Sequence, residues 1–129
     1  MTFAWIQENV VLAIHERLLA DHGGATGIRD RGLLDSALAR PLNLEAYDAP
    51  DIFQAAAAYA HGIVRNHPFV DGNKRVGFML AFVFLGRNGW DLRATEVDAT
   101  QMMLALAAGE CAESKFADWL RANSVRSKR

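Results

Sequence analysis

The residues best suited to chemistry lie together in one short segment, HPFVDGNKR at positions 67–75. Imidazole is the side chain best suited to accept a proton at neutral pH, so that of His67 could take a proton from an incoming hydroxyl group. Asp71 supplies a hard oxygen ligand of the kind that Mg²⁺ prefers beside phosphate oxygens. Arg75 can grip a phosphate through two parallel hydrogen bonds. A base, a metal-binding carboxylate and a cation are what phosphoryl transfer requires, because its catalysis is mainly positioning and charge stabilisation.

Backbone groups of the same segment favour the same chemistry. Gly72, Asn73 and Lys74 directly precede an apolar run, which places them at the start of a helix. The first amides of a helix lack internal partners and meet the positive end of its dipole, so they form a ready anion site. Taken singly, the residues have simpler explanations, since Asp71 or Asn73 could cap the helix and His67 could be an exposed loop histidine. Only their combination predicts a phosphate site.

The elements that must position this segment are helices. Apolar residues at spacings of three and four predict an all-α fold of about six helices. We expect three of them at about 7–22, 74–88 and 112–123. The other three should be a short helix that Pro41 ends, a helix with Pro50 in its first turn, and a helix that begins after Thr95. The helix at about 74–88 is apolar on every side from 76 to 85 and too short to cross a membrane, which makes it the expected central helix. Strands can only be short, at 5–6, 25–29 or 91–92, enough for one hairpin.

Bulk composition narrows the function classes. The 129 residues fit one domain, 1–129, with 51% hydrophobic and 22% charged residues. A net charge of −1 gives no positive field to recruit nucleic acid directly. The basic cluster near the C-terminus favours a frayed, solvated end; its members are Arg121, Arg126, Lys128 and Arg129. The lone Cys111, the lack of a signal-peptide pattern and the lack of a membrane-spanning run predict a cytoplasmic protein without a membrane partner.

The segment 67–75 resembles the Fic-family signature H-x-F-x-[D/E]-G-N-x-R at all six specified positions. By residue frequency, such a match should occur by chance in far fewer than about one in ten thousand chains of this length. Further stretches resemble the death-on-curing (Doc) branch of that family. They are 21–24, 27–30, 32–41, 83–89 and 107–110. The resemblance implies an all-α Fic fold and the toxin half of a toxin–antitoxin pair.

The resemblance also implies roles for single residues. His67 would take the proton from a Ser, Thr or Tyr hydroxyl on a target protein, and Phe69 would anchor the loop in the core. Asp71 would hold Mg²⁺. The catalytic group would thus be His67, Asp71 and Arg75, and the nucleotide phosphates would meet Gly72, Asn73, Lys74 and Arg75.

Residues 24–30 match the flap of the family, where the target chain is thought to dock by backbone pairing. The docking residues would be Thr26, Gly27, Ile28 and Arg29.

One departure bears on the reaction. Adenylylating Fic enzymes resemble G-N-G-R-x-x-R, whereas this chain has Lys74 in place of the glycine and Phe78 in place of the second arginine. Doc toxins share the lysine and are regarded as kinases that bind ATP in the reverse sense. The resemblance therefore favours phosphorylation with ATP and Mg²⁺, and it points to a translation elongation factor such as EF-Tu as the target. Adenylylation by the same site is one alternative, and a catalytically idle antitoxin-binding module is another.

The inhibitory string [S/T]-x-x-x-E-[G/N] of many Fic enzymes does not occur in the sequence. We therefore expect inhibition in trans, by a cognate antitoxin that covers the nucleotide site.

Overall fold

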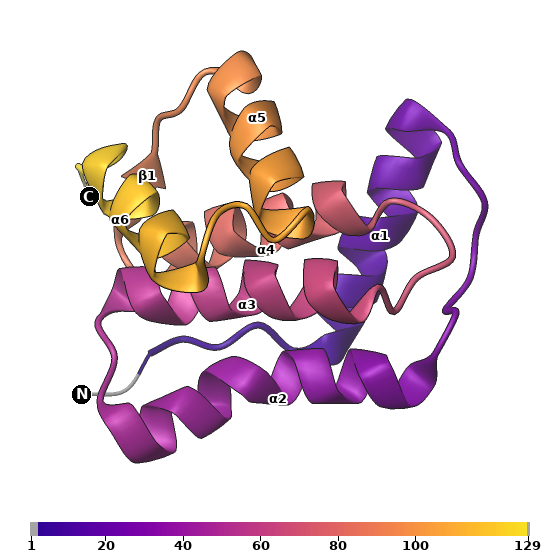
Figure 1. Cartoon of the computed structure of the whole chain (residues 1–129), viewed down its shortest axis with the longest axis horizontal. Coiled ribbons are helices and arrows are strands. Elements are labelled where there is room, and N and C mark those ends of the chain that lie inside the picture. The colour runs from indigo at the N-terminus through magenta and orange to yellow at the C-terminus, as the bar shows by residue number, and fades with distance from the viewer. Residues whose placement is uncertain (1–2, 129) are drawn as a thin grey trace.

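Six helices and one short antiparallel ladder make up residues 3–128, the part of the chain that the computed structural model describes. In chain order they are α1 (Glu8–His22), α2 (Arg31–Asp48), α3 (Ile52–Asn66), α4 (Asn73–Arg87), β1 (Trp90–Leu92), α5 (Glu96–Ala107), α6 (Glu113–Ala122) and β2 (Ser124–Arg126). The all-α fold predicted from the sequence is confirmed. Figure 1 shows α3 and α4 side by side in the middle of the molecule.

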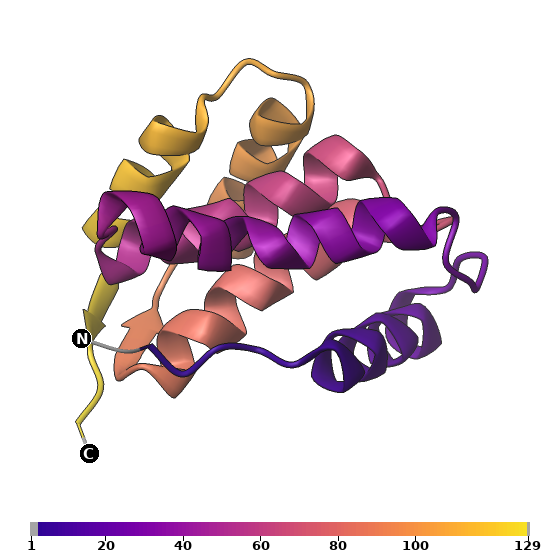
Figure 2. The same ribbon diagram turned by 90° about the horizontal axis from the view of Figure 1, so that it is seen from below.

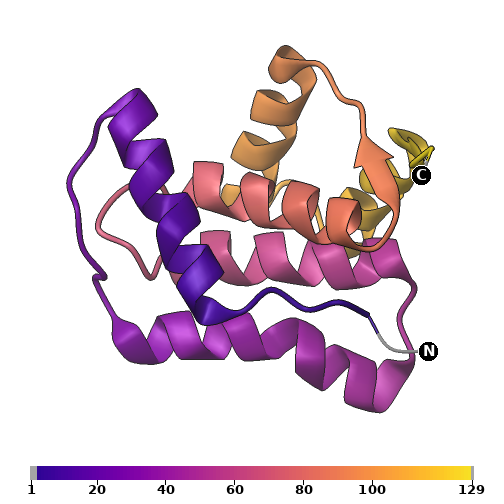
Figure 3. The same cartoon turned by 180° about the vertical axis from the view of Figure 1, so that it is seen from behind.

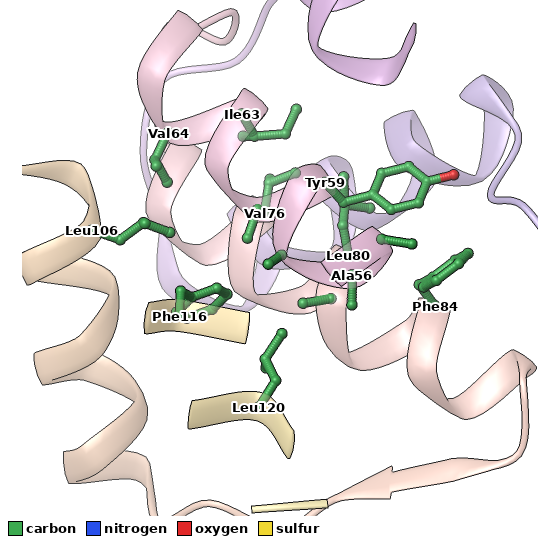
Figure 4. Close-up of a cluster of buried hydrophobic side chains, with 14 of the residues drawn as sticks. Ala56, Tyr59, Ile63, Val64, Val76, Leu80, Phe84, Leu106, Phe116 and Leu120 are labelled. Atoms are coloured by element: carbon green, nitrogen blue, oxygen red, sulfur yellow. The ribbon is translucent and has the colours of Figure 1, made fainter. Parts of the chain in front are cut away.

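The core is built around the α3–α4 pair. One continuous cluster of buried side chains joins the helices, with α3 and α4 contributing the largest share. Figure 4 shows its centre, which includes Tyr59, Ile63, Val76, Leu80, Phe84, Leu106, Phe116 and Leu120. Burial of these apolar side chains is the main force that holds the two helices, and hence the loop between them, in place.

The most buried helix is α3, whereas the sequence pointed to α4. Residues 55–58 of α3 are four alanines with no exposed surface, and α3 packs against α2, α4, α5 and α6. Short side chains let neighbouring helices approach closely, a property that hydrophobic periodicity does not register. In α4, Phe82 is 43% exposed and Phe78 is half-buried, so one side of this apolar helix remains open.

Pro41 does not stop α2, which continues to Asp48. Leu34, Ala37 and Pro41 are three or four residues apart and share the buried face of α2, which Figure 2 shows laid along α3. A helical proline removes the amide that would bond the carbonyl four residues earlier, here that of Ala37. Gly62 of α3 lies against this carbonyl, because a Cβ added there would be 3.1 Å from the Ala37 oxygen. Packing against α3 thus stabilises α2 as one continuous helix that includes Pro41.

Two other helix starts follow from side-chain caps. Asp51 is the N-cap of α3 and forms a reciprocal capping box with Gln54, so Pro50 precedes the helix and does not occupy its first turn. At α5, Thr95 accepts a hydrogen bond from a first-turn amide, which confirms the predicted start.

The predicted strand at 91–92 is confirmed, since β1 pairs with β2 in an antiparallel ladder. Segment 5–6 is not a strand, and segment 25–29 makes a single bridge, between Ile28 and Phe69. Among residues 3–128, no helix is long and apolar enough to cross a membrane.

Arg121 and Arg126 are not part of a frayed end. Arg121 pairs with Asp51 at 2.5 Å, and the guanidinium of Arg126 lies 5.0 Å from the centre of the Trp90 ring. These partners are far away in sequence, so composition alone suggested a loose tail. Arg129 lies outside the described residues.

His61 is a half-buried residue at the edge of the buried face of α3. Its Nε2 lies 3.8 Å from Oε1 of Glu113 in α6. Burial lowers the pKa of His61, with Glu113 opposing that shift.

We expect Gly62→Ala to destabilise the protein by about 1–3 kcal/mol, because its Cβ would press on the Ala37 main chain, which cannot easily retreat. Gly86→Ala is the matched control. A Cβ at Gly86 meets nothing within 4 Å, and a helical alanine should add up to about 1 kcal/mol. Urea denaturation of both variants measures the difference, and equal midpoints would contradict the close α2–α3 contact.

Candidate active site

The loop between α3 and α4 begins at an unusual backbone conformation. His67 is the C-cap of α3 and has a left-handed φ of 53°, with its N–H donating to the Ile63 carbonyl at 2.9 Å. Such a conformation is costly for most residues and persists where the surroundings enforce it, typically at functional sites. The imidazole is exposed at the end of the helix. A base at this position can reach a hydroxyl group of another protein.

Phe69 and Asn73 clamp the centre of the loop. The Phe69 ring is fully buried, as the family resemblance implied. Asn73 is 4% exposed; its Oδ1 accepts from the Phe69 amide at 3.0 Å, and its Nδ2 donates to the Phe69 carbonyl at 2.9 Å. Both ends of the Asn73 side chain are therefore engaged with the loop.

The first turn of α4 has no side-chain cap and is the candidate anion site. Gly72 is the N-cap with a left-handed φ of 82°, and no side chain caps the helix. The amides of Asn73, Lys74 and Arg75 are therefore left for a bound anion. Lys74 and Arg75 are exposed and have no ion-pair partner within residues 3–128. These three amides and two cations are the groups at the start of α4 that could bind a phosphate.

The Asp71 carboxylate is aimed by backbone amides. Its Oδ1 accepts from the Gly72 N–H at 2.9 Å and its Oδ2 from the Ala25 N–H at 3.3 Å. Gly24 must be a glycine here, because its φ is 120° and a Cβ would come within 2.9 Å of Oδ2. Each oxygen keeps lone pairs for a cation. Residues 3–128 hold no cluster of three His, Cys, Asp or Glu side chains, so an ion at Asp71 would need phosphate and water oxygens, which suits Mg²⁺.

The predicted flap runs antiparallel to the loop. The Val70 amide donates to the Gly27 carbonyl at 3.0 Å, and the Arg29 amide donates to the Pro68 carbonyl at 2.6 Å. Figure 3 shows the two segments beside each other, where α1 leads toward α2. Since residues 27 and 29 face the loop, the N–H and C=O of Ile28 face the opposite side. The flap therefore presents an open strand edge to solvent.

The Arg29 side chain also belongs to the loop. Its Nε donates to the His67 carbonyl at 2.7 Å, and Nη2 donates to the Asn66 carbonyl at 3.0 Å. The family resemblance assigned Arg29 to target docking. Its guanidinium instead bonds the carbonyls at the end of α3, next to the candidate base His67. Thr26 and Gly27 remain exposed.

One residue of the site escaped the sequence analysis. His15 of α1 is 5% exposed, its Nε2 lies 2.9 Å from the Asp71 carbonyl oxygen, and its ring stacks on Phe69 at 3.9 Å between centroids. In the sequence it was only one of four scattered histidines. Its spacing of four from Val11 was the available signal, because that spacing puts an imidazole on the apolar face of α1.

A sequence profile described as "Fic/DOC family" matches residues 5–85, which include every residue of this site. The chain belongs to the Fic/Doc family. Among its Fic/Doc relatives is Toxin Doc of Mycolicibacterium smegmatis, which is 42% identical over 95 residues, 69% of this chain and 72% of the relative. Protein kinase doc of Escherichia phage P1 is 31% identical over 117 residues, 90% of this chain and 92% of the relative. The membership predicted from segment 67–75 is thereby confirmed.

We expect Asn73→Ala to lower the stability of this Fic/Doc protein by about 2–4 kcal/mol, because it deletes two buried hydrogen bonds and leaves the Phe69 peptide unpaired. Chemical denaturation measures the loss. The control is Asn9→Ala on the exposed side of α1, which should change stability by no more than about 0.5 kcal/mol. Similar values for both variants would show that the clamp does not hold the loop.

Proposed function

We propose that this protein is the toxin of a toxin–antitoxin pair and acts as a protein kinase, transferring the γ-phosphate of ATP to a hydroxyl side chain of a target protein. The observation that carries the proposal is the uncapped start of α4, flanked by an exposed His67 and an oriented Asp71 carboxylate. The relatives named as a toxin and as a protein kinase support it.

The reaction uses groups of the loop and of the first turn. His67 takes the proton of the target hydroxyl, whose oxygen forms a bond to the γ-phosphorus while the bond to the bridging oxygen of ADP breaks. The amides of residues 73–75 and the Arg75 guanidinium stabilise the charge that spreads over the transferred group. Mg²⁺ held by Asp71 would neutralise further phosphate charge.

Phosphate transfer is preferred to adenylylation because of the α4 surface beyond the anion site. Lys74 occupies the first turn, and Phe78 follows four residues later on the same side of the helix. The Phe78 ring contacts that of Phe82, with centroids 6.5 Å apart, so an apolar surface replaces a second arginine. A nucleotide whose inner phosphates needed that guanidinium would lose a charged partner here.

The target enters along the flap in this proposal. The open edge at Ile28 would pair with an extended segment of the target and present its hydroxyl to His67. A translation elongation factor such as EF-Tu is the proposed target. A cognate antitoxin would restrain the enzyme in trans by covering the nucleotide site.

The deciding experiment follows transfer from ATP to the proteins of a bacterial translation extract, labelled in parallel on the γ- and the α-phosphate. We expect label from the γ position only, and His67→Ala should reduce it at least about 100-fold. The melting temperature should change little, because the imidazole is exposed.

His22→Ala, an exposed histidine at the end of α1, is the matched control and should keep the activity. Label from the α position would make the protein an adenylyltransferase. Absence of label from both positions, across other nucleotides and targets, would leave the idle antitoxin-binding module.

Lys74→Gly tests whether this side chain selects the reaction. We propose that the long Lys74 side chain crowds the anion site where adenylylating enzymes have a glycine. Its removal should therefore permit AMP transfer, seen as α-label on the same target, while γ-transfer falls. Lys74→Arg, which keeps length and charge, is the control and should not gain α-label. A Lys74→Gly variant that transfers neither group would remove the selector role from Lys74.

A further inference from the structure

His15 contacts the catalytic loop but has no part in the chemistry proposed above. It lies on the buried face of α1, which packs against α4. Its Nε2 meets the Asp71 carbonyl at 2.9 Å, and a Cβ added to Gly72 would lie 3.8 Å from its Cδ2. The imidazole edge thus borders the main chain of the two residues that open the anion site.

The direction of this hydrogen bond is determined by its acceptor. A carbonyl oxygen can only accept, so Nε2 of His15 must carry the proton and donate it. The ring cannot rotate freely, because it stacks on Phe69 with an angle of 18° between the planes. Phe69 is itself held by Asn73. The N–H donor of His15 is therefore held both by its bond to the Asp71 carbonyl and by the stacking of its ring on Phe69.

The Asp71 carbonyl lies outside the hydrogen-bond ladder of α4, whose N-cap Gly72 has a left-handed φ of 82°. In an α-helix, the Asp71 carbonyl would accept from the Arg75 amide, four residues on. Here the first such bond is one residue later, from the Val76 amide to the Gly72 carbonyl at 2.9 Å. Because the Asp71 carbonyl is turned toward His15, the Arg75 amide keeps its hydrogen for another acceptor.

We propose that His15 is a positioning residue that holds the Asp71 carbonyl, which keeps the Arg75 amide free for phosphate and the Asp71 carboxylate aimed at the metal. This inference rests on the proposed phosphate transfer for its kinetic consequences. A leucine would fill the same place on the apolar face of α1 without a polar atom to desolvate, and burying an imidazole is costly unless it is bonded. The bond that compensates this cost goes to the catalytic loop.

Two substitutions separate the donor from the ring. His15→Phe keeps a flat ring against Phe69 and removes the donor, whereas His15→Gln keeps an N–H at a similar reach and removes the ring. We expect His15→Phe to raise the Mg²⁺ concentration for half-maximal transfer, or lower the rate, by about 10- to 100-fold, as for other groups that orient metal ligands. His15→Gln should recover most of the activity. His61→Gln removes a histidine that contacts Glu113 and should behave as wild type.

A second readout does not depend on activity. In the wild type, the Arg75 amide should exchange its hydrogen rapidly, as an unbonded amide does. In His15→Phe, the Asp71 carbonyl is released, Gly72 can leave its left-handed conformation for a helical one, and α4 can extend by one residue. The Arg75 amide should then become protected. NMR-detected hydrogen exchange measures this, with His15→Gln expected to remain unprotected.

Unchanged Mg²⁺ dependence and unchanged Arg75 exchange in folded His15→Phe would overturn the inference. An equal loss of melting temperature and activity in both variants, with no change at Arg75, would do so as well, because it would make His15 a packing residue only. If the wild type transferred no phosphate, the proposed function would fail, while the Arg75 amide would still decide the role of His15.

Discussion

The structure depends on how the carbonyl oxygens of the α3–α4 loop are held. Peptide carbonyls near a phosphate site would repel the anion or capture the amides that should bind it. Here they turn toward donors from other parts of the chain. Arg29 binds the carbonyls of Asn66, His67 and Pro68, Asn73 binds that of Phe69, and His15 binds that of Asp71. The amides at the start of α4 are left without a carbonyl partner, so in the proposed reaction they would be preorganised for phosphate.

The flap is part of this arrangement. Its inner edge bonds the loop through Gly27 and Arg29, and its outer edge at Ile28 is open. A target strand that paired with the outer edge would lie one strand spacing from the flap and two from the loop. The same few residues would thus position the target and the candidate base relative to each other, which explains how a short segment without regular structure can hold a reaction geometry.

Local rules were sufficient to predict much of this from the sequence. The Thr95 cap, the start of α4 and the Fic signature all depend on residues within a few positions of one another, such as Gly72 and Asn73. The failures involve distant partners. Pro41 stays helical because α2 packs on α3, Arg121 is ordered by Asp51, and His15 acts on a carbonyl 56 residues away. Neither spacing nor propensity contains those contacts.

The most direct test of the account is a structure of the protein with Mg²⁺ and a non-hydrolysable ATP analogue, compared with the free protein. The account predicts that the terminal phosphate binds the amides of residues 73–75, with the metal at Asp71. The backbone of 67–72 should move by no more than about 0.5 Å, because its carbonyls are already held. A nucleotide bound elsewhere, or a loop that exchanges its bonds to His15, Arg29 and Asn73 for new ones, would contradict it.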